Sequence, residues 1–115
     1  MIMENEKITF SSDDYFVLQD ENKSTTWLVP SAQKNAMEPI ILHLAPGGAS
    51  DEDDPHEGEE FGFVLSGKIL ISLGRVKKKC RKGDSFYFKP DKPHKIENAG
   101  KTEAVVLWIS TPPSF

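Results

Sequence analysis

The sequence predicts an all-β domain in which antiparallel strands form a sandwich or a barrel. Short runs rich in β-branched and aromatic residues recur at regular intervals along the 115 residues, as in known all-β folds. Glycine, proline, asparagine and aspartate gather between these runs, where turns need them. No window of about a dozen residues has the 3.6-residue apolar period of a helix. These three observations favour the all-β class.

The predicted strands follow one another with short turns between them. In chain order they lie within residues 7–19, 25–29, 40–45, 60–73, 76–81, 85–88, 94–98 and 103–110. Ser66 and Gly67 interrupt the run 60–73 and divide it into two strands. The stretch from Pro30 to Pro39 is polar and bounded by prolines, so it is a predicted loop. The prolines of the tail 111–115 lack amide donors and cannot continue a central strand.

Length, hydropathy and cysteine content describe a single intracellular domain. A chain of 115 residues is long enough to bury a core, and a single cysteine, Cys80, excludes an internal disulfide. No apolar run approaches the roughly 18 residues that cross a bilayer, and the N-terminus lacks the order of a signal peptide. We therefore expect a cytoplasmic protein that makes no membrane contact.

Charged residues are distributed unevenly along the chain. Seven of the ten residues from Asp51 to Glu60 are acidic, whereas residues 75–82 contain six lysines and arginines. The net charge of −4 argues against direct contact of this domain with nucleic acid. The basic stretch fits a solvent-facing edge strand, where lysine discourages aggregation. The acidic loop is most simply a solvated loop, but its negative potential also favours a cationic small molecule.

Potential metal ligands concentrate in the acidic loop and the strands after it. Residues two apart on a strand share a face, so Asp54 and His56 point together, and Glu60 rejoins that face after a kink at residues 57–58. His94 begins a later strand that antiparallel pairing can bring opposite. Two imidazoles with one or two carboxylates suit Fe, Mn, Ni or Zn, and two histidines with one carboxylate form the facial triad of non-haem iron sites. The alternative is a metal-free polar pocket.

The acidic loop and the strand after it resemble the first motif of the cupin superfamily, whose members are antiparallel β-barrels with a metal or ligand site inside. That motif has a glycine, five residues, His-x-His, three or four residues, a glutamate, six residues and a glycine. Gly47-Gly48 matches its opening, and His56, Glu60 and Gly67 match its second half with the same spacing. Asp54 replaces the first histidine of His-x-His.

A later stretch resembles the second cupin motif. Gly83, Pro90, His94 and Asn98 follow its order, with the proline shifted by one position. The resemblance covers roughly residues 15–115. It implies one cupin domain, an antiparallel double-stranded β-helix or jelly roll, preceded by an N-terminal arm at residues 1–14. Within the superfamily, the chain looks most like the C-terminal sensor domains of XRE-type helix-turn-helix regulators.

The resemblance implies a set of site residues. It places a divalent metal on His56, Glu60 and His94, with Asp54 where a histidine usually stands. A carboxylate at that position lowers the affinity for softer ions, so a metal-bound and a metal-free cavity both remain open. In the metal-free alternative, His56 and Glu60 hydrogen-bond to each other or to a ligand.

Other residues have a functional and a structural interpretation. Phe86, Phe88 and Trp108 are candidate ligand contacts, although aromatic residues at a period of two more often fill a barrel. His43 lies on the opposite strand face from its leucine neighbours, and we expect a structural role for it. Cys80 has no histidine beside it in the sequence, so we expect an unreactive thiol.

These features support two kinds of function. In the first, which we favour, a small-molecule effector enters the barrel and shifts a loop or dimer equilibrium that a DNA-binding partner reads. The second is a metal-dependent enzyme, a dioxygenase or isomerase, in which an open coordination position polarises substrate or activates oxygen. A storage or structural cupin is a third, weaker hypothesis. The chain has no helix-turn-helix pattern, so a sensor is either part of a longer protein or acts alone. The resemblance also implies a homodimer.

Overall fold

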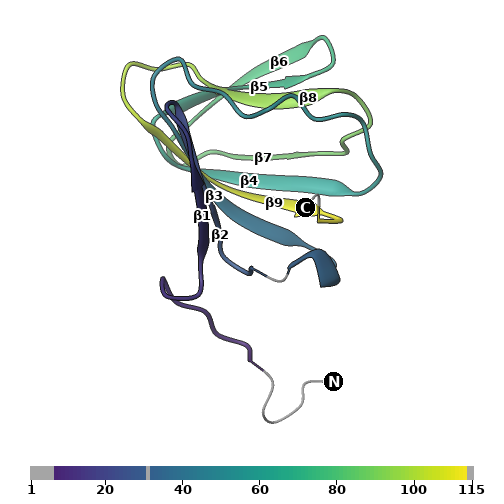
Figure 1. The fold of residues 1–115 in the computed structure, drawn as a ribbon. Coiled ribbons are helices and arrows are strands. Elements are labelled where there is room, and N and C mark those ends of the chain that lie inside the picture. The colour runs from purple at the N-terminus through teal and green to yellow at the C-terminus, as the bar shows by residue number, and fades with distance from the viewer. Residues whose placement is uncertain (1–6, 31, 114–115) are drawn as a thin grey trace.

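Two antiparallel β-sheets face each other in the computed structural model, which describes residues 7–30 and 32–113 (Figure 1). In this part of the chain the strands are β1 (Phe16–Gln19), β2 (Lys23–Trp27), β3 (Glu38–Leu44), β4 (Glu59–Ser66), β5 (Lys68–Leu73), β6 (Val76–Arg81), β7 (Ser85–Phe88), β8 (His94–Asn98) and β9 (Ala104–Thr111). Within these residues the helical structure is one 3-10 turn, Ala32–Lys34. None of the helices in the described residues could cross a membrane.

The larger sheet has the strand order β1-β2-β3-β9-β4-β7, and the smaller sheet has the order β6-β5-β8. In Figure 1 the smaller sheet lies above β4, β7 and β9, and β1 and β2 run upright at the left of the view. The central strand β9 pairs with β3 on one side and β4 on the other. This topology confirms the predicted all-β class and the antiparallel jelly-roll fold.

The loop before β4 completes the smaller sheet. Ala49 forms a bridge with Glu97, and Asp53 forms a bridge with His94, both antiparallel. Ser50 N–H also donates to the carbonyl of Ile96 at 2.8 Å. The acidic loop therefore lies beside β8 as an irregular fourth strand and is held there by backbone hydrogen bonds.

The core lies between the sheets because alternate residues of each strand point inward. On β9 the buried residues are Ala104, Val106 and Trp108, and they face Ile69, Ile71 and Ile96 of the smaller sheet. Gly62 of β4 makes room for this packing, since a Cβ there would lie 2.0 Å from Cζ of Phe86. Glycine at this position thus lets the Phe86 ring lie directly against the backbone of β4.

The predicted strands agree with the observed ones apart from their ends. The run 60–73 does divide at Ser66-Gly67, where Gly67 has a φ of +81° that other residues rarely adopt. The predicted loop from Pro30 to Pro39 is wrong at its end, because β3 begins at Glu38 and contains Pro39. Proline is tolerated there because it falls next to the start of the strand. Residues 1–6 of the predicted N-terminal arm and 114–115 of the tail lie outside the described residues.

Candidate metal centre

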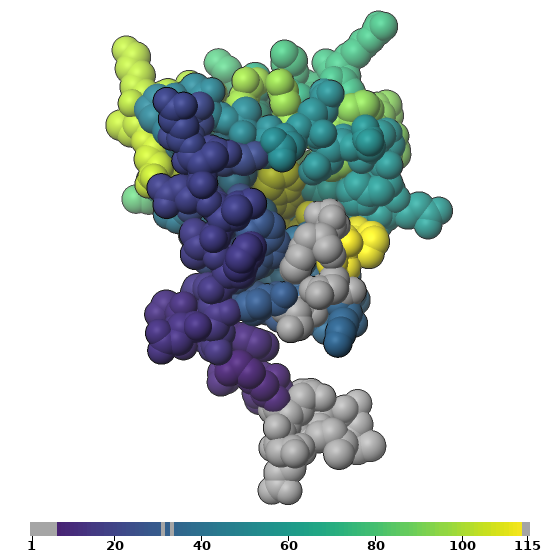
Figure 2. All heavy atoms as spheres, in the orientation of Figure 1, coloured from purple at the N-terminus to yellow at the C-terminus, as the bar shows by residue number. Residues whose placement is uncertain are grey.

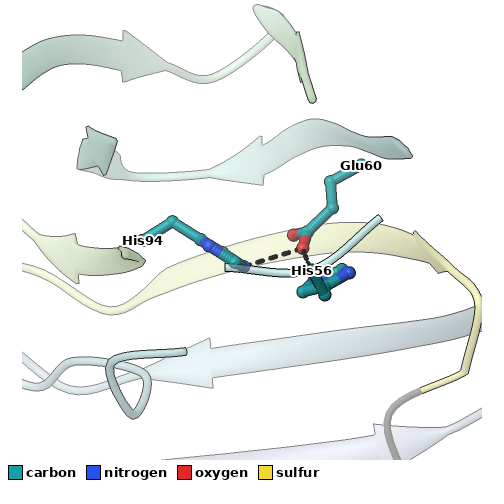
Figure 3. A group of neighbouring side chains, drawn as sticks. All are labelled: His56, Glu60 and His94. Atoms are coloured by element: carbon teal, nitrogen blue, oxygen red, sulfur yellow. Dashed lines mark hydrogen bonds and ion pairs between the residues drawn. The ribbon is translucent and has the colours of Figure 1, made fainter. Parts of the chain in front are cut away.

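Glu60 is the buried carboxylate around which the site is built. It is the second residue of β4, its side chain is 1% exposed, and the alternation of the strand points it between the sheets. Its Oε1 accepts a hydrogen bond from Nε1 of Trp108 at 2.7 Å. Its Oε2 lies 3.0 Å from Nε2 of His56 and 2.8 Å from Nε2 of His94 (Figure 3). The indole of Trp108 thus holds Oε1, and the imidazoles of both histidines contact Oε2.

His94 comes from the opposite sheet, at the first position of β8. Backbone hydrogen bonds in both directions join it to Asp53, and its side chain is 1% exposed. Its Nδ1 lies 2.9 Å from the carbonyl of Lys92. A carbonyl only accepts, so Nδ1 carries the proton and Nε2 faces Glu60. The strand start and this carbonyl together fix the ring.

His56 comes from the acidic loop and is half-buried. Its backbone N–H donates to the carbonyl of Pro90 at 2.8 Å, and its Nδ1 lies 2.8 Å from the carbonyl of Glu57. Gly58 then turns the chain into β4 with a φ of +115°. A Cβ on Gly58 would lie 1.7 Å from the carbonyl oxygen of Thr111, so only glycine fits there. This turn places the His56 side chain next to Glu60.

The charges around Glu60 are arranged asymmetrically. Burial lowers the pKa of His94, but the Glu60 carboxylate, the Lys92 carbonyl and Asp53 raise that pKa by more, so it lies above its usual value. Burial raises the pKa of Asp53, and Glu60 adds to this, while the two histidines oppose it. Carboxylates and imidazoles are therefore coupled within one small volume.

The three donor atoms fit a divalent ion. One ligand atom each from His56, Glu60 and His94 lies within 4.8 Å of the others, and they are the group of this kind found among the described residues. Cis ligands about 2.1 Å from an ion are about 3.0 Å apart, which matches the contacts of 2.8 and 3.0 Å. The contact between His94 Nε2 and Glu60 Oε2 does not have the angles of a hydrogen bond. This buried nitrogen therefore has no hydrogen-bond partner in the described residues. A metal ion would satisfy it.

The fourth predicted ligand, Asp54, is not brought into this group. Its side chain is exposed, although it lines the same cavity as His56 and Glu60. The acidic residue closer to the histidines is Asp53, whose Oδ2 lies 3.6 Å from Nε2 of His94. Strand alternation predicted that Asp54 and His56 share a face, but the loop bridges β8 only at isolated positions and does not keep a strict period of two.

Two hollows border the site. A cavity of about 240 Å³ is lined by Asp53, Asp54, His56, Glu60, Ser110, Pro112 and Pro113. A second cavity of about 190 Å³ lies between the acidic loop and β2–β3, with Trp27, Glu38, Ile40, Leu42 and Trp108 among its lining residues. In Figure 2 the yellow of β9 is visible between the teal of the loop and the blue of β3. Asp53 and Ser110 line both cavities, so the two are adjacent.

The predicted aromatic contacts occupy different environments. Phe86 is buried in the core, with its ring 6.3 Å from that of Trp108 in an edge-on arrangement. Phe88 is half-buried and meets the His94 ring edge-on at 5.5 Å. Trp108, 5% exposed, lines the second cavity and binds Glu60. A ligand contact thus stays a prediction for all three, and only Trp108 is placed both at a cavity and on Glu60.

His43 and Cys80, for which we expect no functional role, and Asn98 of the second motif all lie in structural surroundings. His43 faces outward and its Nδ1 lies 3.5 Å from a carboxylate oxygen of Glu103. Asn98 donates to the carbonyls of Leu44 and Thr102 and accepts from Gly100 N–H. Burial raises the pKa of Cys80, and the Asp84 carboxylate adds to this. A raised pKa disfavours the reactive thiolate, in line with an unreactive thiol.

The pairing of tryptophan with glutamate was not predicted from the sequence. Besides Trp108 and Glu60, Nε1 of Trp27 donates to Oε2 of Glu38 at 2.6 Å. In both pairs the tryptophan binds the residue two positions before its direct cross-strand partner, which is Ile40 for Trp27 and Gly62 for Trp108. A glutamate at an inward position of a strand is the signal that could have led to them, because a buried carboxylate needs a donor.

The family model for the cupin domain matches residues 40–110, more than half of the chain. An uncharacterized protein of Methanocaldococcus jannaschii is 30% identical over 99 residues, which cover 85% of this chain and 79% of that protein. The HTH-type transcriptional regulator PuuR of Escherichia coli is 22% identical over 109 residues, which cover 95% of this chain and 59% of PuuR. This chain therefore spans less than two thirds of that regulator.

Two solved structures share the fold, and their names describe different kinds of protein. The cupin domain of an XRE family transcriptional regulator from Enterobacter cloacae has a TM-score of 0.71 at 23% identity, and the match covers 81% of this chain and 99% of that one. The structure of Fe(II) HppE has a TM-score of 0.79 at 19% identity, and the match covers 95% of this chain and 62% of that one. These likenesses show a shared fold, and the family match over residues 40–110 shows that the chain belongs to the cupin family.

Proposed function

We propose that this chain is a metal-binding cupin module that senses a small-molecule effector and is linked to transcriptional regulation. One observation carries the proposal. His56 and His94 each have Nδ1 on a backbone carbonyl, and both direct Nε2 at the same buried oxygen of Glu60. With Nδ1 engaged by a carbonyl, each neutral imidazole offers the lone pair of its Nε2 beside the Glu60 oxygen, so three potential ligand atoms converge on one point. A divalent ion is the cation that suits all three donors.

His56, Glu60 and His94 are the residues that would hold the ion, and Fe(II), Mn(II), Ni(II) and Zn(II) are the candidates. When bound, such an ion supplies a Lewis acid with coordination positions left over for a ligand. The chain contributes orientation, because two carbonyls fix the imidazole rings, and it contributes water exclusion, because Glu60 and His94 are each 1% exposed.

The effector in this proposal enters the adjacent cavity of about 190 Å³. Its walls combine Trp27 and Trp108 with acidic Glu38 and Asp53. Lys23 also lines the cavity, but it is paired with Asp51 at 2.9 Å. Aromatic walls beside acidic side chains suit a small cationic molecule. Binding would favour one arrangement of the acidic loop, which a DNA-binding partner would read as a shift in population.

The regulatory link is supported by relatives of two kinds. PuuR is named as an HTH-type transcriptional regulator, and a cupin domain of an XRE family regulator has the same fold. In such an arrangement this domain would sense the effector and another domain or protein would contact DNA. The acidic net charge of −4 agrees with that division of roles.

A metal-dependent enzyme, such as a dioxygenase or isomerase, is the second candidate. It is favoured by the donor set itself, because two histidines and one carboxylate leave coordination positions open beside a cavity of about 240 Å³. The enzyme requires both bound metal and turnover, whereas an effector could also enter a metal-free cavity.

Metal analysis of protein purified without chelator tests the metal site. We expect about one divalent ion per chain, or uptake of one from added Fe(II), Mn(II) or Zn(II), and a rise in the unfolding temperature on binding. No stoichiometric metal and no uptake would contradict the enzyme and the metal-binding part of the sensor proposal. A thermal-shift screen of small amines and amino acids on the loaded protein then tests the sensor. If Glu60→Gln leaves every hit unchanged, the effector does not depend on this site.

We also propose that the module is a cytoplasmic homodimer. The edge strand β1 exposes Phe16, Val17 and Leu18 to solvent, and an edge strand with apolar side chains is a natural surface for a second copy. Sedimentation should show a dimer. Val17→Lys, on the exposed edge, should shift it toward monomer, whereas a monomeric wild-type protein would contradict this part of the proposal.

A further inference from the structure

We infer that Trp108 is a positioning residue of the metal centre: its indole N–H occupies Oε1 of Glu60 and leaves Oε2 as the single carboxylate oxygen offered to an ion. The inference rests on the proposed metal site. The two oxygens of Glu60 have different partners. Oε1 lies 2.7 Å from Nε1 of Trp108, and Oε2 lies beside Nε2 of both histidines.

An indole is suited to this role because its N–H donates and cannot accept or ligate. It carries no charge, so it orients the carboxylate without neutralising it, as a lysine or arginine would. Glu60 is 1% exposed and Trp108 is 5% exposed, so little water can replace the indole on Oε1. The hydrogen bond therefore holds the carboxylate plane in one orientation.

The ring of Trp108 is itself held in place. Its direct partner on β4 is Gly62, and the ring of Phe86 occupies the space that a side chain on Gly62 would take. Phe86 meets the edge of the Trp108 ring with centroids 6.3 Å apart. Trp108 therefore cannot move away from Glu60 without disturbing the core. Its fixed ring in turn fixes the direction in which Oε2 points.

The chain contains a matched control for a merely structural role. Trp27 donates to Glu38 across the same diagonal of the same sheet, but Glu38 is not part of the His–Glu–His group. If the tryptophan–glutamate pair only stabilises the sheet, loss of either indole should have similar effects on metal binding. If Trp108 positions a ligand, only its loss should alter the ion's coordination.

The test compares Trp108→Phe with Trp27→Phe, each checked for folding by circular dichroism. We expect Trp108→Phe to weaken Zn(II) binding by about 10-fold or more, as for other outer partners of metal ligands, and Trp27→Phe to stay within about two-fold of wild type. With Co(II), Trp108→Phe should change the visible absorption bands because Oε1 becomes free to bind, while Trp27→Phe should reproduce the wild-type spectrum. A folded Trp108→Phe with wild-type affinity and spectrum overturns the inference.

A second measurement needs no variant and decides the matter if Trp108→Phe fails to fold. The chain has two tryptophans, so a ¹⁵N-labelled sample gives two indole N–H signals. Adding Zn(II) to wild type should shift the Trp108 signal and leave that of Trp27 nearly in place. Zn(II) bound at the histidines with an unmoved Trp108 signal overturns the positioning role alone. Failure of wild type to bind any ion overturns the metal site as well, so the two failures are distinguishable.

Discussion

The larger sheet presents two buried carboxylates, Glu38 and Glu60, in nearly equivalent settings. Both pair in register with Ser110, one on each side of β9, so about two strand spacings, or about 10 Å, separate their backbones. Both are almost fully buried, and each accepts a hydrogen bond from a tryptophan displaced along the same diagonal. The same local pattern therefore occurs twice on one face.

The difference between the two lies in what the opposite side of the molecule provides. Glu60 faces His94 at the start of β8 and His56 from the loop that crosses beside it. Glu38 faces a cavity whose other lining residues include Leu18, Lys23 and Asp51. A buried carboxylate held by an indole supplies one possible ligand oxygen, and the imidazoles from outside the sheet complete a candidate metal site at Glu60.

The largest effect should come from removing the charge of one carboxylate at a time. Glu60→Gln should lower the affinity for Zn(II) or Fe(II) at least about 100-fold, because it removes a ligand oxygen, whereas loss of an outer partner costs 10–100-fold. Glu38→Gln removes the same charge from a carboxylate outside the His–Glu–His group and should leave the affinity within about two-fold. Calorimetric titration of both variants measures this contrast. Equal losses in the two variants would show that the ion does not sit at Glu60.

The fold was predictable because its signals are local. Alternating apolar residues, the Gly67 break and the prolines of the loops are each readable within a few positions, and they agree with the observed strands. The start of β3 escaped prediction because Pro39 signals a loop, although proline is tolerated near the beginning of a strand.

The candidate site was predictable only in part, since it depends on contacts between distant segments. The spacing of His56 and Glu60 and the motif around His94 led to the three residues whose donor atoms converge. The contact between Trp108 and Glu60 was not readable, because this hydrogen bond joins residues 48 positions apart. The choice between Asp53 and Asp54 was not readable either, because it depends on how an irregular loop bridges β8.

A smaller effect should follow from disturbing the turn that brings His56 to Glu60 but has no counterpart at Glu38. Gly58→Ala places a Cβ against the carbonyl of Thr111 at a φ of +115°. We expect a loss of about 3 kcal/mol in unfolding free energy and a loss of about 10-fold in metal affinity as His56 is displaced. Urea unfolding and metal titration measure the two effects.

Gly83→Ala is the matched control for the turn. Gly83 also has a positive φ, +89°, but nothing lies within 4 Å of its added Cβ. It should cost about 1 kcal/mol of stability and leave metal affinity unchanged. If both variants weaken the ion equally, the Gly58 turn has no special part in placing His56.

The smallest effect on metal affinity should come from the two aspartates near His94, Asp53 and Asp54, and it should differ between them. Asp53 lies 3.6 Å from His94 Nε2 and is half-exposed, so Asp53→Asn removes a screened charge and should weaken metal binding only about two- to five-fold. Asp54 is exposed and outside the donor group, so Asp54→Asn should leave the affinity unchanged. A larger loss in Asp54→Asn than in Asp53→Asn, measured by the same titration, would mean that the loop rearranges on binding and brings Asp54 to the ion. The position that replaces the motif histidine would then be a ligand after all, and Glu60 would share its ion with a second carboxylate.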